Sequence, residues 1–536
     1  MTSVHTAAHW LGPHDRPLLG WLTTPPTTSS GCVILPPLGY EYFTSHRTLR
    51  TLAEQLALAG HSVLRIDYDG TGDSAGDQWD EERVTAWRAG LAHAANALRG
   101  LGAETITVVG LRFGATVALI DAHEIAADAV VAWAPAEAGR RYVKELKLLG
   151  TPVPDVDDAI VIAGLVFSGA TLRDLAALDV TKIDAPPAPR VLVVERPDRP
   201  VNDATIDRIE SVGATVDRLT LPGSDLALDL PTEYATVPTE IVDAIAAWVG
   251  TAPTEDGHDV DHEVSSAVIT RGEAAVEERF VRLGPNELAG IITTPKPAPS
   301  TAGHATVVFL NTGSETHIGP GRAWVEYARS LSAMGHTSLR VDFRGWGESP
   351  DDDKAPGRSY DAHTVADAVD IVEQLARDGH ERIVLAGLCA SAWVALKAML
   401  SAPVAGVIAI NPQMYWQPGD PVEATMAETR KRRTRDRERD ATGRRLWSVL
   451  DALGVRHPAA TWLRAVGRQQ VPVLMLFAEG DDGLDFLRDR AGRSLQHVLQ
   501  SAPIEVVEVP GIDHPMHRHW LRGEIVAAIS GFLDRL

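Results

Sequence analysis

Cys389 has the clearest potential for covalent chemistry in this sequence, because it stands where a predicted strand meets a predicted helix. The apolar run RIVLAG leads into Gly387-Leu388-Cys389-Ala390-Ser391, and the helical stretch AWVALKAML follows. A nucleophile in a sharp strand-to-helix turn needs small neighbours, and the helix N-terminus favours a thiolate there. The pattern therefore predicts Cys389 as a nucleophile, against the plainer interpretation of a small buried side chain. Ser391 fits less well as the nucleophile, because the pattern needs a small residue two positions after it and Trp393 stands there.

A cysteine nucleophile needs a base and a group that orients the base. The apolar run VPVLMLF opens into Asp481 and Asp482, and the last apolar run, IEVVEVP, opens into His514. We predict His514 as the base because it directly follows a strand, whereas the competitors His517 and His519 fall in the next helical stretch. We predict Asp481 as the orienting acid, with Asp482 in reserve.

The negative charge that develops during attack on a carbonyl needs hydrogen-bond donors, which backbone amides can supply. The run TVVFL is followed by Asn311, Thr312 and Gly313, and the cysteine is followed by Ala390. We expect one donor amide from Ala390 and the other from the turn at Thr312 and Gly313. The sequence leaves open which amide of that turn is used.

These residues must be positioned by a regular scaffold, and the sequence indicates one in each half of the chain. Short β-branched runs alternate with helical patterns in the order β-α-β-α-β, which predicts an α/β fold with a mostly parallel, doubly wound sheet. Ligands of such sheets bind beyond the carboxyl ends of the strands. The candidate residues all follow strands, as this rule requires.

The scaffold is repeated. Residues 60–74, GHSVLRIDYDGTGDS, recur as residues 335–349, GHTSLRVDFRGWGES. A repeat of this length and separation indicates two whole domains. We predict a first domain at 1–250, an acidic linker at 251–272, and a catalytic domain at 273–536. The shared Gly-x-Gly follows a strand in both copies and is interpreted as a structural turn.

The first half lacks most of the chemistry of the second. Arg112 occupies the nucleophile position in Gly110-Leu111-Arg112-Phe113-Gly114, and Leu226 occupies the histidine position. Only Asp198 could match the acid. We predict a degenerate domain that supports the other, the alternative being that Arg112 binds a carboxylate or phosphate. Cys32 lies within a strand-like run and is predicted to be part of the core.

About sixty residues separate two strands of the second half, too many for a simple loop. We predict a helical cap at about 413–470, in which Met414, Tyr415 and Trp416 form an apolar wall over Cys389 or simply pack. Residues 428–445 of this cap hold nine basic and four acidic side chains. This basic stretch is either a solvated helix face or a docking surface for an acidic acyl or peptidyl carrier protein.

Composition excludes several classes of protein. The 536 residues carry 50 Lys and Arg against 72 Asp and Glu, a formal net charge of −22, which disfavours nucleic acid as a partner. Two cysteines cannot form a disulfide framework, and we find no secretory signal and no apolar run long enough for a membrane helix. We therefore expect a soluble, cytoplasmic protein without a membrane partner. The sequence gives no oligomeric state.

The chain resembles two fused α/β-hydrolase domains of the serine-aminopeptidase-like type. Residues 36–76 with GLRFGA (110–115) resemble the second of the two exosortase-system-associated hydrolases. TGSETHIGPGR (312–322), LRVDFRGWGES (339–349) and GLCAS (387–391) resemble the first. A looser resemblance, carried by the cysteine, histidine and aspartate alone, is to cysteine-dependent acyltransferases and Dieckmann-type cyclases of specialised metabolism.

A cysteine nucleophile favours exchange with thioesters, because the acyl-enzyme has a similar energy. We therefore predict an enzyme that takes an acyl group from an activated thioester onto Cys389 and then transfers or cyclises it. The alternatives are a hydrolase of an ester, thioester or lactone and, in a different class, a non-catalytic scaffold or binding protein. We find no phosphate loop, dinucleotide motif or metal-ligand cluster, and we predict neither a cofactor nor a metal.

Overall fold

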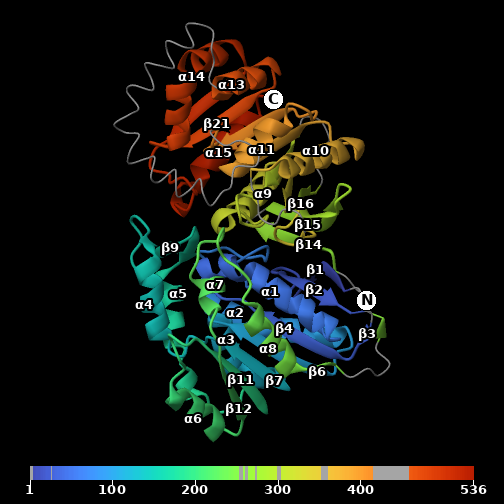
Figure 1. The fold of residues 1–536 in the computed structure, drawn as a ribbon, viewed down its shortest axis with the longest axis vertical. Helices are drawn as coiled ribbons and strands as arrows, with labels where there is room; N and C mark the ends of the chain where they lie inside the picture. The colour runs from blue at the N-terminus through green and yellow to red at the C-terminus, as the bar shows by residue number, and fades with distance from the viewer. Residues whose placement is uncertain are drawn as a thin grey trace. The chain divides into compact units, whose positions relative to one another are not determined.

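The computed structural model describes residues 4–25, 27–252, 258–259, 264–271, 274–297, 304–351, 360–414 and 458–536. The chain divides into two compact units, Met1–Phe280 and Val281–Leu536 (Figure 1). The segment 251–272, which we interpreted as a linker, contains strand β14 (Ser266–Arg271). This strand pairs antiparallel with β15 (Ala274–Leu283), within which the boundary between the units falls.

The first unit is built on an eight-stranded sheet in the order β1-β2-β5-β4-β6-β7-β11-β12. The two pairings at the β1 edge are antiparallel and the rest are parallel. The central strands are buried along nearly their whole length, as expected of a parallel sheet covered on both faces. The strands are β1 (His5–Leu11), β2 (Leu18–Thr24), β4 (Ser30–Leu35), β5 (Ser62–Ile66), β6 (Thr105–Leu111), β7 (Ala129–Trp133), β11 (Arg190–Glu195) and β12 (Thr215–Thr220).

Helices cover both faces of this sheet, because alternate side chains of each strand point to opposite sides. One core joins Cys32 and Ile34 to α1 (Tyr40–Leu58) and α8 (Thr239–Val249). The opposite core joins Val33 and Leu35 to the other main helices, α2 (Arg83–Gly100), α3 (Phe113–Asp121) and α6 (Asp203–Ser211). An insertion between β7 and β11 adds a small sheet of β8 (Thr151–Pro152), β9 (Ile160–Ile162) and β10 (Leu165–Phe167), flanked by α4 (Gly139–Leu149) and α5 (Gly169–Ala177).

The second unit repeats this plan. Its sheet has the order β14-β15-β16-β18-β17-β19-β20-β21-β22, so from β15 onward the strand order is that of the first sheet. The pairings from β18 to β22 are parallel. The strands are β16 (Leu288–Lys296), β17 (Thr306–Leu310), β18 (Thr337–Val341), β19 (Ile383–Leu388), β20 (Gly406–Ile410), β21 (Val473–Ala478) and β22 (Ile504–Val509).

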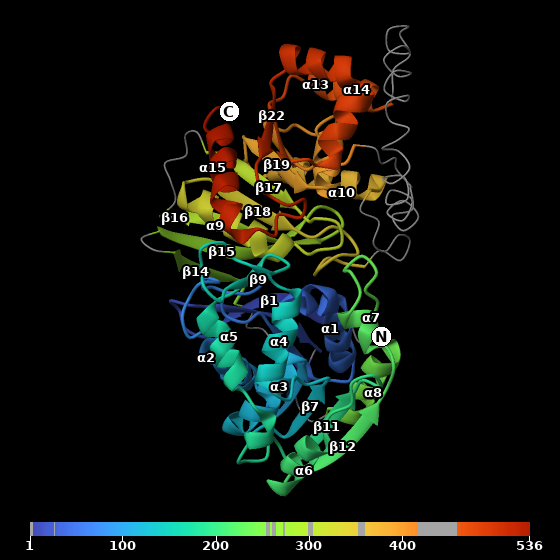
Figure 2. The same cartoon turned by 90° about the vertical axis from the view of Figure 1, so that its left-hand side faces the viewer.

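Two layers of helices flank the second sheet as well. Figure 2 shows α9 (Ala323–Ala333) and α15 (Arg522–Leu533) on one side, where they share a core. On the other side a second core contains α10 (Ala362–Arg377), α11 (Ala390–Ala398), α13 (Pro458–Arg468) and α14 (Asp482–Ser501). The expected doubly wound α/β architecture is therefore present. Among the residues that the structure describes, no helix has the length and apolarity needed to cross a membrane.

The repeated Gly-x-Gly turn has the structural role predicted for it. A Cβ atom on Gly72 would lie 2.0 Å from the Asp67 carboxylate, and one on Gly347 would lie 2.0 Å from that of Asp342. In the second unit the Ser349 hydroxyl donates to the Asp342 carbonyl at 2.6 Å and accepts from the Ala289 amide at 2.9 Å. The turn thus ties β18 to β16, and the equivalent serine of the first unit ties β5 to β2 in the same way.

Candidate active site

Cys389 lies in a strained turn between β19 and α11. Its φ and ψ are 56° and −109°, a left-handed conformation that side chains other than glycine seldom adopt. A Cβ atom on Gly387 would lie 2.4 Å from the Ser391 backbone, so the turn requires glycine there. The Cys389 amide donates to the Ile410 carbonyl at 2.9 Å, which fixes the turn to the neighbouring strand. The backbone therefore forms the sharp strand-to-helix turn predicted for the nucleophile, which we call the elbow.

The predicted acid and base lie together. Asp481 is the N-cap of α14 and accepts a hydrogen bond from the Gly483 amide at 2.8 Å through Oδ1. Its other oxygen, Oδ2, is 2.6 Å from Nδ1 of His514. Asp482, the reserve candidate, is the exposed first residue of the helix. This N-cap hydrogen bond thus holds Asp481 in the orientation that the imidazole needs.

Cys389 lies close enough to His514 for a side-chain interaction between them to raise the pKa of the imidazole. Burial alone lowers the pKa of His514, but the hydrogen bonds with Asp481 and Cys389 outweigh burial and raise the pKa to about 10. The arrangement favours the protonated, cationic form of the imidazole. The amide nitrogen of Gln413 lies 3.4 Å from Nε2 of the same ring.

Asn411, which the sequence did not indicate, fixes the loops that carry the acid and the base. Its side chain is fully buried, accepts from the Ala478 amide at 2.7 Å and donates to the His514 carbonyl at 2.8 Å. The residue directly follows β20 and has a positive φ of 44°. Only the folded chain brings these groups together, although an asparagine directly after a strand was a weak indication.

The turn predicted to supply an oxyanion donor follows β17. Asn311 braces it by accepting from the Phe343 amide at 3.1 Å and donating to the Glu315 carbonyl at 3.2 Å. Gly313 has a φ of 54°, and within the described residues Thr312 Oγ1 is buried without a hydrogen-bond partner. Ala390 is the buried first residue of α11. The use of these amides as donors stays a prediction.

The side chains that we weighed as competitors are partly or fully buried, and two of them are bonded to other groups. Ser391 is 1% exposed, and its hydroxyl bonds to the backbone of Leu388 at 3.0 and 3.1 Å. Burial lowers the pKa of His517 to about 4. The ring of His519 lies 3.4 Å from Glu326. Cys32 is completely buried in β4, and burial raises the pKa of its thiol to about 12.

Of the predicted cap at about 413–470, the structure describes residues 413–414 and 458–470, which include α13. Met414 is 5% exposed and belongs to the large core that also contains Ala390 and Tyr360. Tyr415, Trp416 and the basic stretch 428–445 lie outside the described residues. Tyr360, which the sequence did not single out, has its hydroxyl 3.5 Å from the sulfur of Cys389.

The first unit has an elbow of the same backbone conformation, between β6 and α3, with Arg112 at the nucleophile position. Arg112 has φ and ψ of 55° and −112° and is 7% exposed. Its guanidinium lies 2.8 Å from Glu41 and 2.8 Å from Glu145, over the ring of Tyr142 at 5.6 Å. Burial raises the pKa of Glu41 even though Arg112 lowers it. The arginine is thus paired inside its own unit.

The other two positions of the first unit do not form a pair. The Asp198 side chain is 60% exposed and is bonded by Arg196 at 3.1 Å. Leu226, at the histidine position, is 38% exposed.

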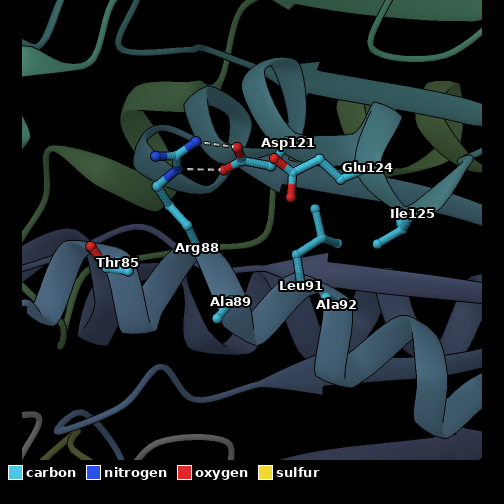
Figure 3. Close-up of a pocket in the computed structure, with 8 residues that line it drawn as sticks. All are labelled: Thr85, Arg88, Ala89, Leu91, Ala92, Asp121, Glu124 and Ile125. Atoms are coloured by element: carbon cyan, nitrogen blue, oxygen red, sulfur yellow. Dashed lines mark hydrogen bonds and ion pairs between the residues drawn. The ribbon is translucent and has the colours of Figure 1, made fainter.

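The first unit also has a shallow pocket of about 230 Å³ away from this elbow (Figure 3). It is lined by Arg88 and Asp121, which are joined by two hydrogen bonds of 2.8 and 2.5 Å, together with Thr85, Ala89, Leu91, Ala92, Glu124 and Ile125. The sequence gave no indication of this pocket.

Residues 307–528 match the model of an alpha/beta hydrolase family. The fold is that of the α/β-hydrolases. This match covers the elbow, the acid and the histidine of the second unit. No curated protein matches the chain.

Several solved structures resemble part of the chain at low identity. Est1E from Butyrivibrio proteoclasticus with ferulic acid bound is 18% identical, with 45% of this chain and 97% of that chain covered and a TM-score of 0.36. A Pyrococcus furiosus esterase is 16% identical, with 48% and 90% covered and a TM-score of 0.33. A puromycin-hydrolyzing peptidase of Mycobacterium tuberculosis is 16% identical, with 48% and 40% covered and a TM-score of 0.34. Likenesses at this level say nothing about the reaction.

Proposed function

We propose that the second unit is a hydrolase-type enzyme that forms an acyl-enzyme on Cys389 from an activated thioester and then transfers or cyclises the acyl group. The observation that carries this proposal is the interaction of His514 with both groups: Asp481 Oδ2 lies 2.6 Å from its Nδ1, and Cys389 is near enough to raise its pKa. This is the order of acid, base and nucleophile that covalent acyl transfer requires. The match to an alpha/beta hydrolase family supports the class of enzyme.

The reaction follows from these roles. His514 takes the proton of Cys389, and the thiolate attacks the carbonyl carbon of the thioester. The oxyanion of the tetrahedral intermediate accepts from the amide of Ala390 and from the turn at Thr312 and Gly313. The intermediate collapses, the carbon–sulfur bond of the substrate breaks, and His514 protonates the departing thiol. An acceptor then attacks the acyl-enzyme after giving its proton to His514.

The choice of acceptor separates the reactions that this site could catalyse. Capture by an external amine, alcohol or thiol is acyl transfer, and capture by a carbon of the same acyl chain is a Dieckmann-type ring closure. In the ring closure His514 removes the proton next to a carbonyl. Hydrolysis of an ester, thioester or lactone is the second candidate, supported by the family match. A product with a transferred acyl group or a ring would indicate acyl transfer or ring closure, whereas a free acid would indicate hydrolysis.

The first unit has a different part in this proposal. Its elbow holds a paired arginine and its acid is exposed, so we assign it no reaction. The shared strand order and the repeated Asp–Gly turn support an origin by duplication, with the first copy kept as a structural partner. A whole chain that acts only as a scaffold would show no dependence on Cys389.

The acyl donor of this proposal is held by an acidic acyl or peptidyl carrier protein that docks on residues 428–445. The net positive charge of this stretch, within a chain of −22, supports the idea. Steering of this kind acts on the association rate and weakens with salt. Replacing Arg432, Arg433, Arg435 and Arg437 with alanine should slow the reaction with a carrier-bound substrate and leave an N-acetylcysteamine thioester unaffected. Equal effects on both substrates would contradict docking.

Intact-protein mass spectrometry after incubation with a panel of acyl thioesters tests the proposal directly. The expected result is a single acyl adduct that disappears in Cys389→Ala and persists in Cys32→Ala, the matched control at the buried cysteine. Product analysis in the same reactions then separates transfer and ring closure from hydrolysis. An adduct that persists in Cys389→Ala, or turnover by that variant, would overturn the assignment of the nucleophile.

A further inference from the structure

A tyrosine side chain reaches the reactive sulfur from a turn that holds none of the acid, base or nucleophile. The hydroxyl of Tyr360 lies 3.5 Å from Sγ of Cys389, within hydrogen-bond range for sulfur. Its ring is 6% exposed and packs edge-on against Trp393, with ring centroids 5.7 Å apart and planes at 71°. Trp393 lies one helical turn after Cys389 on α11. The tyrosine is therefore held against both ends of the first turn of the nucleophile's helix.

The backbone of Tyr360 is also fixed. It directly precedes Asp361, the N-cap of α10, whose side chain accepts from the His363 amide at 3.2 Å. The carbonyl of the same aspartate accepts from the Thr364 hydroxyl at 2.8 Å. A hydroxyl held by a capped helix and an aromatic contact needs little reorganisation when charge develops on the sulfur.

We propose that Tyr360 is a further catalytic residue, whose hydroxyl donates a hydrogen bond to the sulfur of Cys389 whenever that sulfur carries negative charge. This inference rests on the proposed function of Cys389. The sulfur is charged before it attacks the substrate, and again when the acyl group leaves it. In that second step the carbon–sulfur bond of the acyl-enzyme breaks, its electron pair returns to Sγ, and the acceptor's proton resides on His514. The tyrosine thus stabilises the state that begins and ends each cycle.

Packing alone does not account for the hydroxyl. A phenylalanine would make the same edge-on contact with Trp393, whereas the tyrosine adds a hydroxyl within hydrogen-bond distance of the sulfur. A thiolate accepts such a bond more strongly than a thiol does, because the acceptor is ionised. The hydroxyl is therefore placed to stabilise negative charge that develops on the sulfur.

The charged groups around this sulfur come from several elements. His514 approaches from the loop after β22, with Asp481 from the start of α14 behind it. Lys397 lies further along α11, with its ammonium 5.4 Å from the Trp393 ring and 5.1 Å from that of Trp462 on α13. Burial lowers the pKa of this lysine. Tyr360 differs from all of these groups, because it is a donor that carries no charge of its own.

The test measures the thiolate without any acyl substrate. The rate of alkylation of Cys389 by iodoacetamide in the full chain is followed against pH by peptide mass spectrometry. In Tyr360→Phe the midpoint of this profile should move upward by about one pH unit, a roughly tenfold loss of thiolate at a given pH. Tyr327→Phe is the matched control, since within the described residues that buried hydroxyl has no hydrogen-bond partner, and its midpoint should not move.

An unchanged midpoint in a folded Tyr360→Phe would overturn the inference. If that variant fails to fold, 3-fluorotyrosine introduced at position 360 provides a second test, because its more acidic hydroxyl is a stronger donor and should move the midpoint downward. An unchanged midpoint there would also overturn the inference. A failure of the proposed function would look different: no acyl adduct would form on Cys389, while the shift in the alkylation profile would remain.

Discussion

The elbows of the two units have the same backbone conformation but carry different side chains, Arg112 in the first and Cys389 in the second. The φ and ψ angles of Arg112 and Cys389 agree within about 3°, and both amides donate to the neighbouring strand at 2.9 Å. A Cβ atom on Gly110 would lie 2.3 Å from the Gly114 backbone, as one on Gly387 would lie 2.4 Å from that of Ser391. The strained turn is therefore a property of the fold, and the chemistry depends on the side chain that it carries.

The two units differ in the side chains that fix the loops next to the elbow, which in the second unit carry Asp481 and His514. Ala134 and Asn411 both directly follow the neighbouring strand and both have a positive φ, of 47° and 44°. Asn411 reaches the loop of His514, whereas in the first unit the indole of Trp133 donates to Ser224 at 2.9 Å instead. The second unit has a polar side chain that joins the loops of its acid and base, and the first unit has an alanine at the matching position.

The largest expected difference between the elbows is in turnover. Cys389→Ala should lower the rate by about 10⁴-fold or more, as loss of a nucleophile does in related arrangements. Arg112→Ala should leave the acylation rate within a few-fold of the wild type, because its partners belong to the first unit. Steady-state rates and acyl adducts of both variants check this. A comparable loss in Arg112→Ala would show that the units share the reaction.

The free energy of unfolding should instead be affected more by Arg112→Ala than by Cys389→Ala. Arg112→Ala leaves Glu41 buried without its cation, and we expect a loss of roughly 3–5 kcal/mol in the free energy of unfolding. The double variant Arg112→Ala with Glu41→Gln should recover part of that loss, because the uncompensated charge is gone. Chemical denaturation of both variants beside Cys389→Ala, which should stay close to the wild type, measures the difference. Equal stabilities would mean that the arginine is not needed to neutralise these carboxylates.

Removing Asn411 should make the second unit resemble the first. Asn411→Ala leaves the Ala478 amide without its buried acceptor, which should cost about 1–3 kcal/mol in the free energy of unfolding. Turnover should fall by up to about 10²-fold, because His514 and Asp481 lose their common support. Asn96→Ala, at an exposed position of α2 in the first unit, is the control. A stability loss without any change in turnover would show that the support is not needed for alignment.

Much of this comparison could be predicted from the sequence, because it rests on local patterns. The alternation of runs and helices predicted the doubly wound architecture, and small residues around position 389 predicted the elbow. The repeated Gly-x-Gly was interpreted as a structural turn, and the contact between Gly347 and Asp342 confirms this. The approach of Asp481 to His514 agrees with their expected positions after adjacent strands.

What the sequence did not reveal depends on distant contacts. Asn411, Tyr360 and Gln413 approach the site through packing between helices and loops, and no spacing in the sequence encodes such contacts. Glu41 and Glu145, which neutralise Arg112, are separated from it by 71 and 33 residues. The segment interpreted as a linker forms strand β14, because its residues pair with a strand that follows immediately.

A smaller effect should appear in the pH dependence of stability. The pKa of His514 is raised from 6.5 to about 10, so its contribution to stability is fully present below pH 6.5 and is lost as the pH rises toward 10. Asp481→Asn removes one of the hydrogen bonds that raise the pKa. The variant should therefore lose less stability than the wild type between these pH values. Asp198→Asn should not change this slope, because its carboxylate titrates only in acid.

The smallest expected effect is the gain from rebuilding the first elbow. In the Cys389→Ala background, Arg112→Cys with Leu226→His restores two residue types on a matching backbone, and we expect no turnover. Asp198 is exposed and bonded by Arg196, so it would not orient the new histidine. Glu41 and Glu145 would face the new thiol and disfavour its thiolate, because like charges repel.

Alkylation of that thiol should consequently require a higher pH than alkylation of Cys389 in the wild type. Adding Glu41→Gln and Glu145→Gln should bring its profile back toward lower pH without producing turnover, since the acid and the base still would not form a pair. Acyl-adduct formation and alkylation rates measured on the same samples separate these two requirements. Turnover by the rebuilt elbow would mean that the backbone and a nucleophile suffice, and that the loops held by Asn411 are not what distinguishes the two units.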